Sequence, residues 1–190
     1  MKHLFITGIP SAGKSYLAKK IAKATGAAHF DIDDWREEMR KDPELDKWVQ
    51  FFWNKDEQIY WNQTSCLKHW QNLKNQSEAI WPAIVARVNG IKKSGQPAIF
   101  EGVNILPHLA AKDLDFSGVC LIGESEEIIF ERNKKAPRWG STEAFQKKEA
   151  EIFFNCEGPI YKSESEKHGI KVFSLVGEAK KELMRLWKQK

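Results

Sequence analysis

The residues with the clearest capacity for chemistry lie near the start of the chain, where positions 8–15 read GIPSAGKS. The spacing of the two glycines, the lysine and the serine is that of a phosphate-binding loop, G-x-x-x-x-G-K-S. Glycine lets the backbone turn tightly, so that successive N–H groups point inward at an anion. The lysine adds a positive charge for the terminal phosphates, and the serine hydroxyl is a ligand for Mg²⁺. The loop predicts binding of a nucleoside triphosphate, with a chance glycine-rich turn as the alternative.

The segments on either side of this loop have the patterns that it requires. Residues 4–6 are apolar and short enough for a buried strand, and Leu17 and Ile21 are four positions apart, as one face of a following helix demands. A helix that begins near Lys14 directs the positive end of its dipole at a bound phosphate. We expect Lys14 to be catalytic and Ser15 to bind the metal. The predicted nucleotide-binding residues are Gly8, Ile9, Pro10, Ser11, Ala12, Gly13, Lys14, Ser15 and Tyr16.

Acidic residues follow two further apolar segments of strand length. Residues 27–31 lead into the acids at 31, 33 and 34, and residues 97–100 lead into Glu101-Gly102. Alternation along an extended chain places Asp31 and Asp33 on the same side, so we expect both in one pocket. Glu101 is expected to reach the metal, through a bound water, or the acceptor, because it lies on the edge of the sheet where ligands bind. Capping of the turn at Asn104 is the alternative for Glu101. A solvated turn that caps the next helix near residue 35 is the alternative for the acids at 31, 33 and 34, above all for Asp34.

The rest of the chain predicts the framework for these groups. Apolar segments at 4–6, 27–31, 97–100, 118–122 and 170–175 alternate with helical patterns. Such alternation predicts an α/β domain over residues 1–190, with a five-stranded parallel sheet covered by helices on both faces. Ligands of such sheets bind at the carboxyl ends of the strands, where the loop, the acids and Glu101 converge. Helices are expected after the loop, over 35–94 with breaks at Pro43 and Pro82, over 125–134, from Ser141 with an interruption at Gly158-Pro159, and at the C-terminal end.

The composition of the chain limits the kinds of partner that it could bind. The formal net charge of +4 suits anionic small molecules but is too small for a nucleic-acid footprint. No apolar run reaches membrane-spanning length, and the first strand leaves no room for a signal peptide. The three cysteines, Cys66, Cys120 and Cys156, have neither metal-ligand nor redox spacing. We expect them to be reduced thiols in a cytoplasmic protein.

Tryptophan is concentrated in one region: six of the eight lie between positions 35 and 81. We expect most of them to pack in the core of a helical substrate-binding region over 35–95, because tryptophan side chains usually pack. The alternative is that some of them surround a substrate.

In the order of these parts, the chain resembles the P-loop small-molecule kinases, such as adenylate, shikimate and gluconate kinases. Asp31-Ile32-Asp33 matches the D-x-D that ends the second strand of shikimate-kinase-like enzymes. The resemblance implies a fold like that of nucleoside-monophosphate kinases, with ATP and Mg²⁺ as cofactors. It also implies that Asp33 orients or deprotonates the acceptor hydroxyl and that Asp31 belongs to the metal shell.

Two further stretches resemble 2-phosphoglycerate kinases: the start of the helix that carries Arg36, and the turn Glu101-Gly102-Val103-Asn104. Asn104 occupies the position where those enzymes have histidine, so the resemblance does not identify the substrate of this protein. Arg36 and Arg40 are four apart on one helical face and favour a substrate with an anionic group. Pairing with the adjacent glutamates at 37 and 38 is an equal alternative. The predicted substrate residues are Asp33, Arg36, Arg40, Glu101 and Gly102.

A basic segment over 132–141 resembles the lid that closes over the phosphates in kinases of this plan. Arg132 and Arg138 are the predicted lid arginines, catalytic because they stabilise charge on the transferred phosphoryl group. Closure of a lid also excludes water from the reaction. Solvated basic residues on an exposed loop are the competing interpretation.

Together these features predict transfer of the γ-phosphoryl group of Mg-ATP to a hydroxyl or phosphate of a small molecule. One alternative is a non-catalytic ATP-binding regulator or scaffold, whose tryptophan-rich region would bind a partner. Another is a toxin-like or antibiotic phosphotransferase that uses the same chemistry on a different acceptor. The acceptor itself is not predicted.

Overall fold

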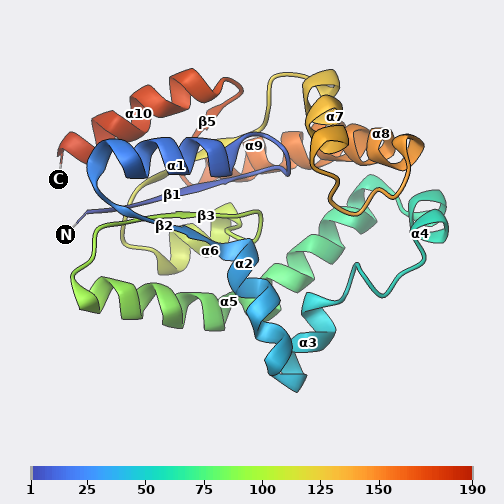
Figure 1. Cartoon of the computed structure of the whole chain (residues 1–190), viewed down its shortest axis with the longest axis horizontal. Helices are drawn as coiled ribbons and strands as arrows, with labels where there is room; N and C mark the ends of the chain where they lie inside the picture. The colour runs from blue at the N-terminus through green and yellow to red at the C-terminus, as the bar shows by residue number, and fades with distance from the viewer. Residues whose placement is uncertain (1, 190) are drawn as a thin grey trace.

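A computed structural model describes residues 2–189 and contains a parallel sheet of five strands in the order β2-β3-β1-β4-β5 (Figure 1). The strands are β1 (His3–Gly8), β2 (Ala28–Asp31), β3 (Ala98–Glu101), β4 (Gly118–Leu121) and β5 (Lys171–Phe173). Each pairs in parallel with its neighbour; for example, Ile6 of β1 lies opposite Glu101 of β3 and Val119 of β4. The predicted fold class and all five strands are confirmed.

Helices cover both faces of this sheet, as a parallel sheet requires. In Figure 1, α1 and α10 lie along one face, and α5 and α6 lie along the other. The helices are α1 (Lys14–Thr25), α2 (Ile32–Glu38), α3 (Pro43–Val49), α4 (Glu57–Gln63), α5 (Cys66–Ser94), α6 (Pro107–Asp113), α7 (Glu126–Lys135), α8 (Glu143–Ile152), α9 (Gly158–Lys167) and α10 (Val176–Gln189). A 3₁₀ turn over Met39–Lys41 follows α2, and a π turn over Phe153–Glu157 joins α8 to α9.

Two predicted helix breaks are wrong. Pro82 lies inside α5, which is 29 residues long and ends at Ser94. Gly158-Pro159 does not interrupt the later helix, because the π turn keeps the chain helical: the Gly158 N–H donates to the Phe153 carbonyl. Pro159 then falls in the first turn of α9, where a missing N–H is tolerated. Pro43, in contrast, begins α3, as a proline at a helix start should.

Helix α2 begins earlier than predicted, directly after β2. The Asp31 side chain accepts a hydrogen bond from the Asp33 N–H at 2.9 Å and so caps the helix. Asp33 therefore lies in the first turn of α2 and not on an extended strand end, so the alternation argument was wrong in its geometry. Helix α6, which begins at Pro107, was not predicted.

The tryptophans divide between the core and a cavity. Trp35, Trp61 and Trp81 are buried, whereas Trp53 is 46% exposed. Trp53 and Trp61 both line the larger cavity described below. Core packing is confirmed for the three buried tryptophans, and Trp61 is also part of the cavity wall. That some tryptophans surround a substrate stays a prediction.

A disulfide joins Cys66, the first residue of α5, to Cys156 in the π turn. The prediction of three reduced thiols was wrong for this pair, because 90 residues separate the two cysteines and only the packing of α5 against the π turn brings them together. Cys120 is a buried free thiol. Within residues 2–189 no helix combines the length and the apolar character needed to cross a membrane.

Candidate active site

The predicted phosphate-binding loop joins β1 to α1 and has the backbone of an anion cradle. Gly8 has φ 126°, and a Cβ there would lie 1.9 Å from the Leu121 carbonyl oxygen, so only glycine fits. Ser11 and Gly13 also have positive φ angles, of 57° and 101°. These left-handed residues turn successive N–H groups inward toward the start of α1.

Lys14 lies inside this cradle. Its side chain is buried, and its Nζ donates to the carbonyl oxygens of Gly8 at 3.0 Å and of Ile9 at 2.8 Å. Burial lowers the Lys14 pKa, while the nearby carboxylates of Glu101 and Asp33 act to raise it. An ammonium group is thus held at the centre of the loop by weak carbonyl partners, which an anion can replace.

A cavity of about 160 Å³, which we call the phosphate cavity, opens over the loop and the start of α1. Its lining residues are Ser11, Gly13, Lys14, Ser15, Tyr16, Arg132, Ala136 and Arg138. Arg132, in the last turn of α7, donates from Nη1 to the Ser11 carbonyl at 3.0 Å, and its Nη2 lies 3.7 Å from Glu124 Oε1. Arg138 makes no hydrogen bond or ion pair to another residue in the described part of the chain. The structure therefore places both predicted lid arginines beside the loop.

Carboxylates crowd the adjacent strand ends. Glu101 ends β3, is 1% exposed, and lies 3.3 Å from the His29 Nε2. Burial raises its pKa, but the His29 hydrogen bond, the Lys14 charge and the Ser15 hydroxyl outweigh burial and lower the pKa below its usual range. The pKa of Asp31 is raised to about 7 by burial and by the negative charges of Asp33 and Glu101. Asp31, Asp33, Glu101 and Ser15 thus form one oxygen-rich group.

Gly102 allows α2 to approach the end of β3. A Cβ at this position would lie 2.9 Å from the Ile32 Cβ and 3.5 Å from Asp33 Oδ1. Gly102→Ala is expected to push the first turn of α2 away and to lower turnover by about tenfold to a hundredfold, because small misplacements of a reacting group are costly. Gly90→Ala in α5 is the matched control, because a Cβ added there would meet no atom within 4 Å outside its own helical turn. Equal steady-state rates for the two variants would contradict this role for Gly102.

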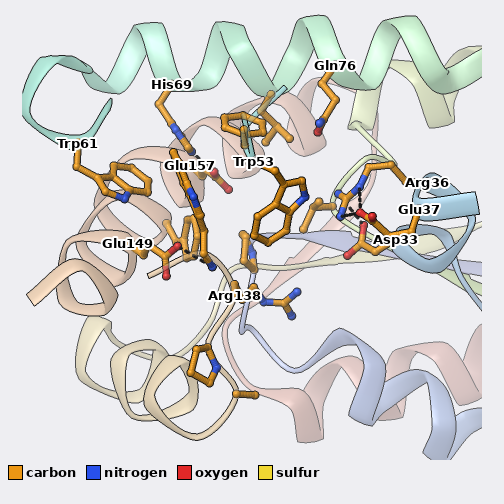
Figure 2. A pocket seen from close by; sticks show the side chains of 18 of the residues that line it. Asp33, Arg36, Glu37, Trp53, Trp61, His69, Gln76, Arg138, Glu149 and Glu157 are labelled. Carbon is orange, nitrogen blue, oxygen red and sulfur yellow. Dashed lines mark hydrogen bonds and ion pairs between the residues drawn. The ribbon is translucent and has the colours of Figure 1, made fainter. Parts of the chain in front are cut away.

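A second cavity of about 510 Å³ lies beyond the acids, between α2, α5 and the helices after the predicted lid (Figure 2). Its lining residues are Pro10, Asp33, Asp34, Arg36, Glu37, Phe52, Trp53, Trp61, His69, Leu73, Gln76, Val103, Ala136, Pro137, Arg138, Trp139, Glu149, Phe153 and Glu157. We call it the acceptor pocket, after the role proposed for it below. Its size is typical of a site for one small molecule. Ala136 and Arg138 line both cavities, so the two adjoin at the predicted lid.

The two predicted substrate arginines have different positions. Arg36 lines the acceptor pocket, where it donates to Asn104 Oδ1 at 3.1 Å and lies 3.5 Å from Asp33 and 3.4 Å from Glu37. Arg40 is half exposed in the 3₁₀ turn, pairs with Glu37 and Asp46, and does not line the pocket. The Arg36 charge is therefore largely balanced by carboxylates, as the pairing alternative held.

Sequence reasoning missed the carboxylates at the far end of the pocket. Glu149 and Glu157 are each 1% exposed. One signal was available for Glu149: it lies four residues after Phe145 and three before Ile152, so helical spacing puts it on the same face as these apolar residues, where a charged side chain is unusual. Glu157 and its partner His69 are brought together by tertiary packing, with Glu157 Oε1 2.8 Å from His69 Nε2, and no sequence pattern indicated them.

Glu149 makes stability depend on pH. Burial raises its pKa to about 7, although its Oε1 accepts hydrogen bonds from the Trp139 and Gly140 N–H groups. Between pH 4.5 and 7 the folded protein therefore holds a proton that the unfolded chain has released, so this contribution to stability is lost as pH rises. Glu149→Gln should be more stable than wild type at pH 8 by up to about 3 kcal/mol and similar at pH 4.5, by urea unfolding. The exposed Glu151→Gln is the control; identical pH dependence in wild type and Glu149→Gln would contradict the prediction.

Comparison with solved structures shows which fold this is. Shikimate kinase from Acinetobacter baumannii, in complex with shikimate, is similar over 100% of this chain and 94% of that chain, with a TM-score of 0.59 and 10% identity. Shikimate kinase from Bacteroides thetaiotaomicron is similar over 98% of each chain, with a TM-score of 0.50 and 12% identity. No protein-family model matches the sequence, and no curated protein sequence matches significantly. The chain has the fold of the P-loop small-molecule kinases, as the sequence predicted.

Proposed function

We propose that this protein is an ATP-dependent kinase that phosphorylates a hydroxyl group of a small molecule. The observation that carries the proposal is the junction of the two cavities at Arg138, which lines both. A nucleotide whose phosphates occupy the loop would present its terminal phosphoryl group at this junction. An acceptor in the larger pocket would meet it there, with Asp33 at its side.

The residues at the loop fit both ATP and Mg²⁺. The backbone cradle and the Lys14 ammonium suit the β- and γ-phosphates. The carboxylates of Asp31, Asp33 and Glu101 lie close enough to raise the Asp31 pKa to about 7. A divalent cation bound among them would stabilise their ionised forms. Ser15, Asp31 and Glu101 would hold the ion, directly or through water, with the phosphates supplying further oxygens, as is usual for Mg²⁺. When bound, the ion neutralises charge on the phosphates.

The chain's own groups divide the remaining work. Lys14, Arg132 and Arg138 surround the phosphate cavity, and their positive charges would stabilise charge on the equatorial oxygens during transfer. Asp33 lies at the edge of the acceptor pocket, where its carboxylate can accept a hydrogen bond from the attacking hydroxyl and remove the proton. The segment over 132–141 would exclude water as a lid.

Location and partners follow from this chemistry. ATP is abundant in the cytoplasm, so we place the activity there. The proposed partner is a small-molecule substrate; a nucleic acid or a membrane has no role in the mechanism. A hydroxylated acceptor is preferred to a phosphate acceptor because the carboxylate of Asp33 suits a hydroxyl proton and repels a phosphate.

The test is an ADP-release assay with purified protein and Mg-ATP against a panel of hydroxylated metabolites, nucleosides and nucleoside monophosphates. A single acceptor that raises ADP release well above the rate with water alone would support the proposal. Tight ATP binding with uniformly low ADP release would overturn it and favour the nucleotide-binding regulator.

A further inference from the structure

The end of the acceptor pocket away from Asp33 contains a carboxylate whose second oxygen lacks a partner. Asn72 donates to the Tyr60 hydroxyl at 3.3 Å, and this hydroxyl lies 2.7 Å from His69 Nδ1. With Tyr60 as donor to Nδ1, His69 Nε2–H donates to Glu157 Oε1 at 2.8 Å. Glu157 Oε2 has no hydrogen-bond partner although it is buried. The chain of hydrogen bonds fixes Glu157 as an acceptor with one oxygen to spare.

Glu149 repeats this arrangement from the neighbouring helix. Its Oε1 accepts from the backbone N–H groups of Trp139 at 3.2 Å and Gly140 at 3.0 Å, and its Oε2 is buried with no hydrogen-bond partner. Leaving a buried acceptor unpaired costs stability. Above the Glu149 pKa of about 7, where this side chain is ionised, the pocket contains two unpaired buried acceptors, which indicate a missing donor. The buried Trp61 Nε1–H also lacks a partner at this end.

Three aromatic side chains, Phe52, Trp61 and Trp139, line the same end of the pocket. Their rings pack against one another: Trp139 lies 5.5 Å from Trp61 and 6.3 Å from Phe52. Tyr60 packs 5.1 Å from both tryptophan rings and supports them. Ring faces attract cations, so an aromatic wall beside carboxylates is suited to an ammonium group. Figure 2 shows Trp61, Glu149 and Glu157 at this end, opposite Asp33, with Trp53 between.

The charge of the whole lining points the same way. Asp33, Asp34, Glu37, Glu149 and Glu157 line the acceptor pocket, against two arginines. One of these arginines is already within 3.5 Å of two carboxylates. The other borders the phosphate cavity, where a nucleotide would engage its charge. The pocket is therefore built for a positive group and not for a second anion.

We propose that the acceptor is a hydroxylated amine, whose protonated amino group binds at Glu149 and Glu157 beside the aromatic wall while its hydroxyl lies at Asp33. This inference rests on the proposed function for the hydroxyl end only; the amine site stands on its own geometry. An ammonium group supplies the donors that both free Oε2 atoms lack. The apolar body of the molecule would lie against Trp53.

The test measures binding without nucleotide, so that it does not depend on catalysis. Calorimetry on wild-type protein compares three linear molecules that share a terminal hydroxyl and a six-carbon chain: aminohexanol, its N-acetyl derivative and hydroxyhexanoate. Aminohexanol should bind at least tenfold more tightly than the other two. Equal binding of the three, or tightest binding of the carboxylate, would overturn the proposal.

A second set of measurements assigns the site. Glu157→Gln should remove the preference for aminohexanol, whereas Glu151→Gln, on the exposed face of α8, should keep it. Retention of the full preference in folded Glu157→Gln would overturn the assignment. Amine binding without any ADP release in the presence of Mg-ATP would support the amine site and contradict the kinase. Turnover of the hydroxy acid but not of the aminoalcohol would support the kinase and contradict the amine site.

Discussion

Lys14→Ala is expected to reduce phosphoryl transfer by at least about 10²- to 10³-fold, the usual effect of removing one preorganised donor at developing charge. The Lys14 ammonium is buried at the centre of the loop and held by two carbonyl oxygens, at 3.0 and 2.8 Å. The two other cations that line the phosphate cavity come from different elements: Arg132 lies in the last turn of α7, and Arg138 lies in the segment that follows α7. The measurement is the steady-state rate of ADP release with saturating acceptor.

Lys19→Ala is the matched control, since Lys19 is an exposed lysine of the same helix. It should keep wild-type rates. Circular dichroism and thermal melting of Lys14→Ala establish that the fold survives. A folded Lys14→Ala protein that turns over at the wild-type rate would contradict the proposed catalytic role of the loop.

Asp33→Asn is expected to lower turnover by about 10²- to 10⁴-fold, the range for loss of a general base. The substitution keeps the shape of the side chain and its place in the first turn of α2, but it removes the group that takes the hydroxyl proton. Affinity for ATP should change little, because Asp33 lines the acceptor pocket and not the phosphate cavity. Rapid-quench kinetics and nucleotide titration separate the two effects.

Glu38→Gln removes a negative charge from an exposed position of the same helix that does not line the acceptor pocket, and it should retain most activity. Equal losses in the two variants would mean that the general field of the acidic cluster matters and that no single carboxylate acts as base. Unchanged turnover in Asp33→Asn would place the base elsewhere.

The parts of the site that could be predicted depend on short stretches of chain. The loop over 8–15 is recognisable because its glycines, lysine and serine act within one local turn. The position of Glu101 at the end of a strand could be predicted, because the short apolar segment before it is enough to identify the strand. The strands were found for the same reason: a buried parallel strand is a continuous apolar run.

What was missed depends on packing between distant segments. The pairing of His29 with Glu101 joins neighbouring strands that are 72 positions apart in sequence. The His69–Glu157 pair spans 88 positions and depends on the π turn, which has no established sequence signal. Asp33 was expected in one pocket with Asp31 because side chains alternate along an extended strand. In the structure Asp31 caps α2, so Asp33 lies in the first turn of that helix and not on a strand.

The bond between Cys66 and Cys156 closes a loop of chain with a sequence separation of 90. In the chain-entropy model, a closed loop of this length restricts the unfolded ensemble enough to raise the free energy of unfolding by about 4–5 kcal/mol. Cys156 immediately precedes Glu157, so the same bond ties one wall of the acceptor pocket to the start of α5. In a cytoplasm rich in glutathione the pair would be reduced, and the chain would lose this constraint. The thermal stability of the protein is thus linked to the redox state of its surroundings through a covalent bond that takes no part in the chemistry.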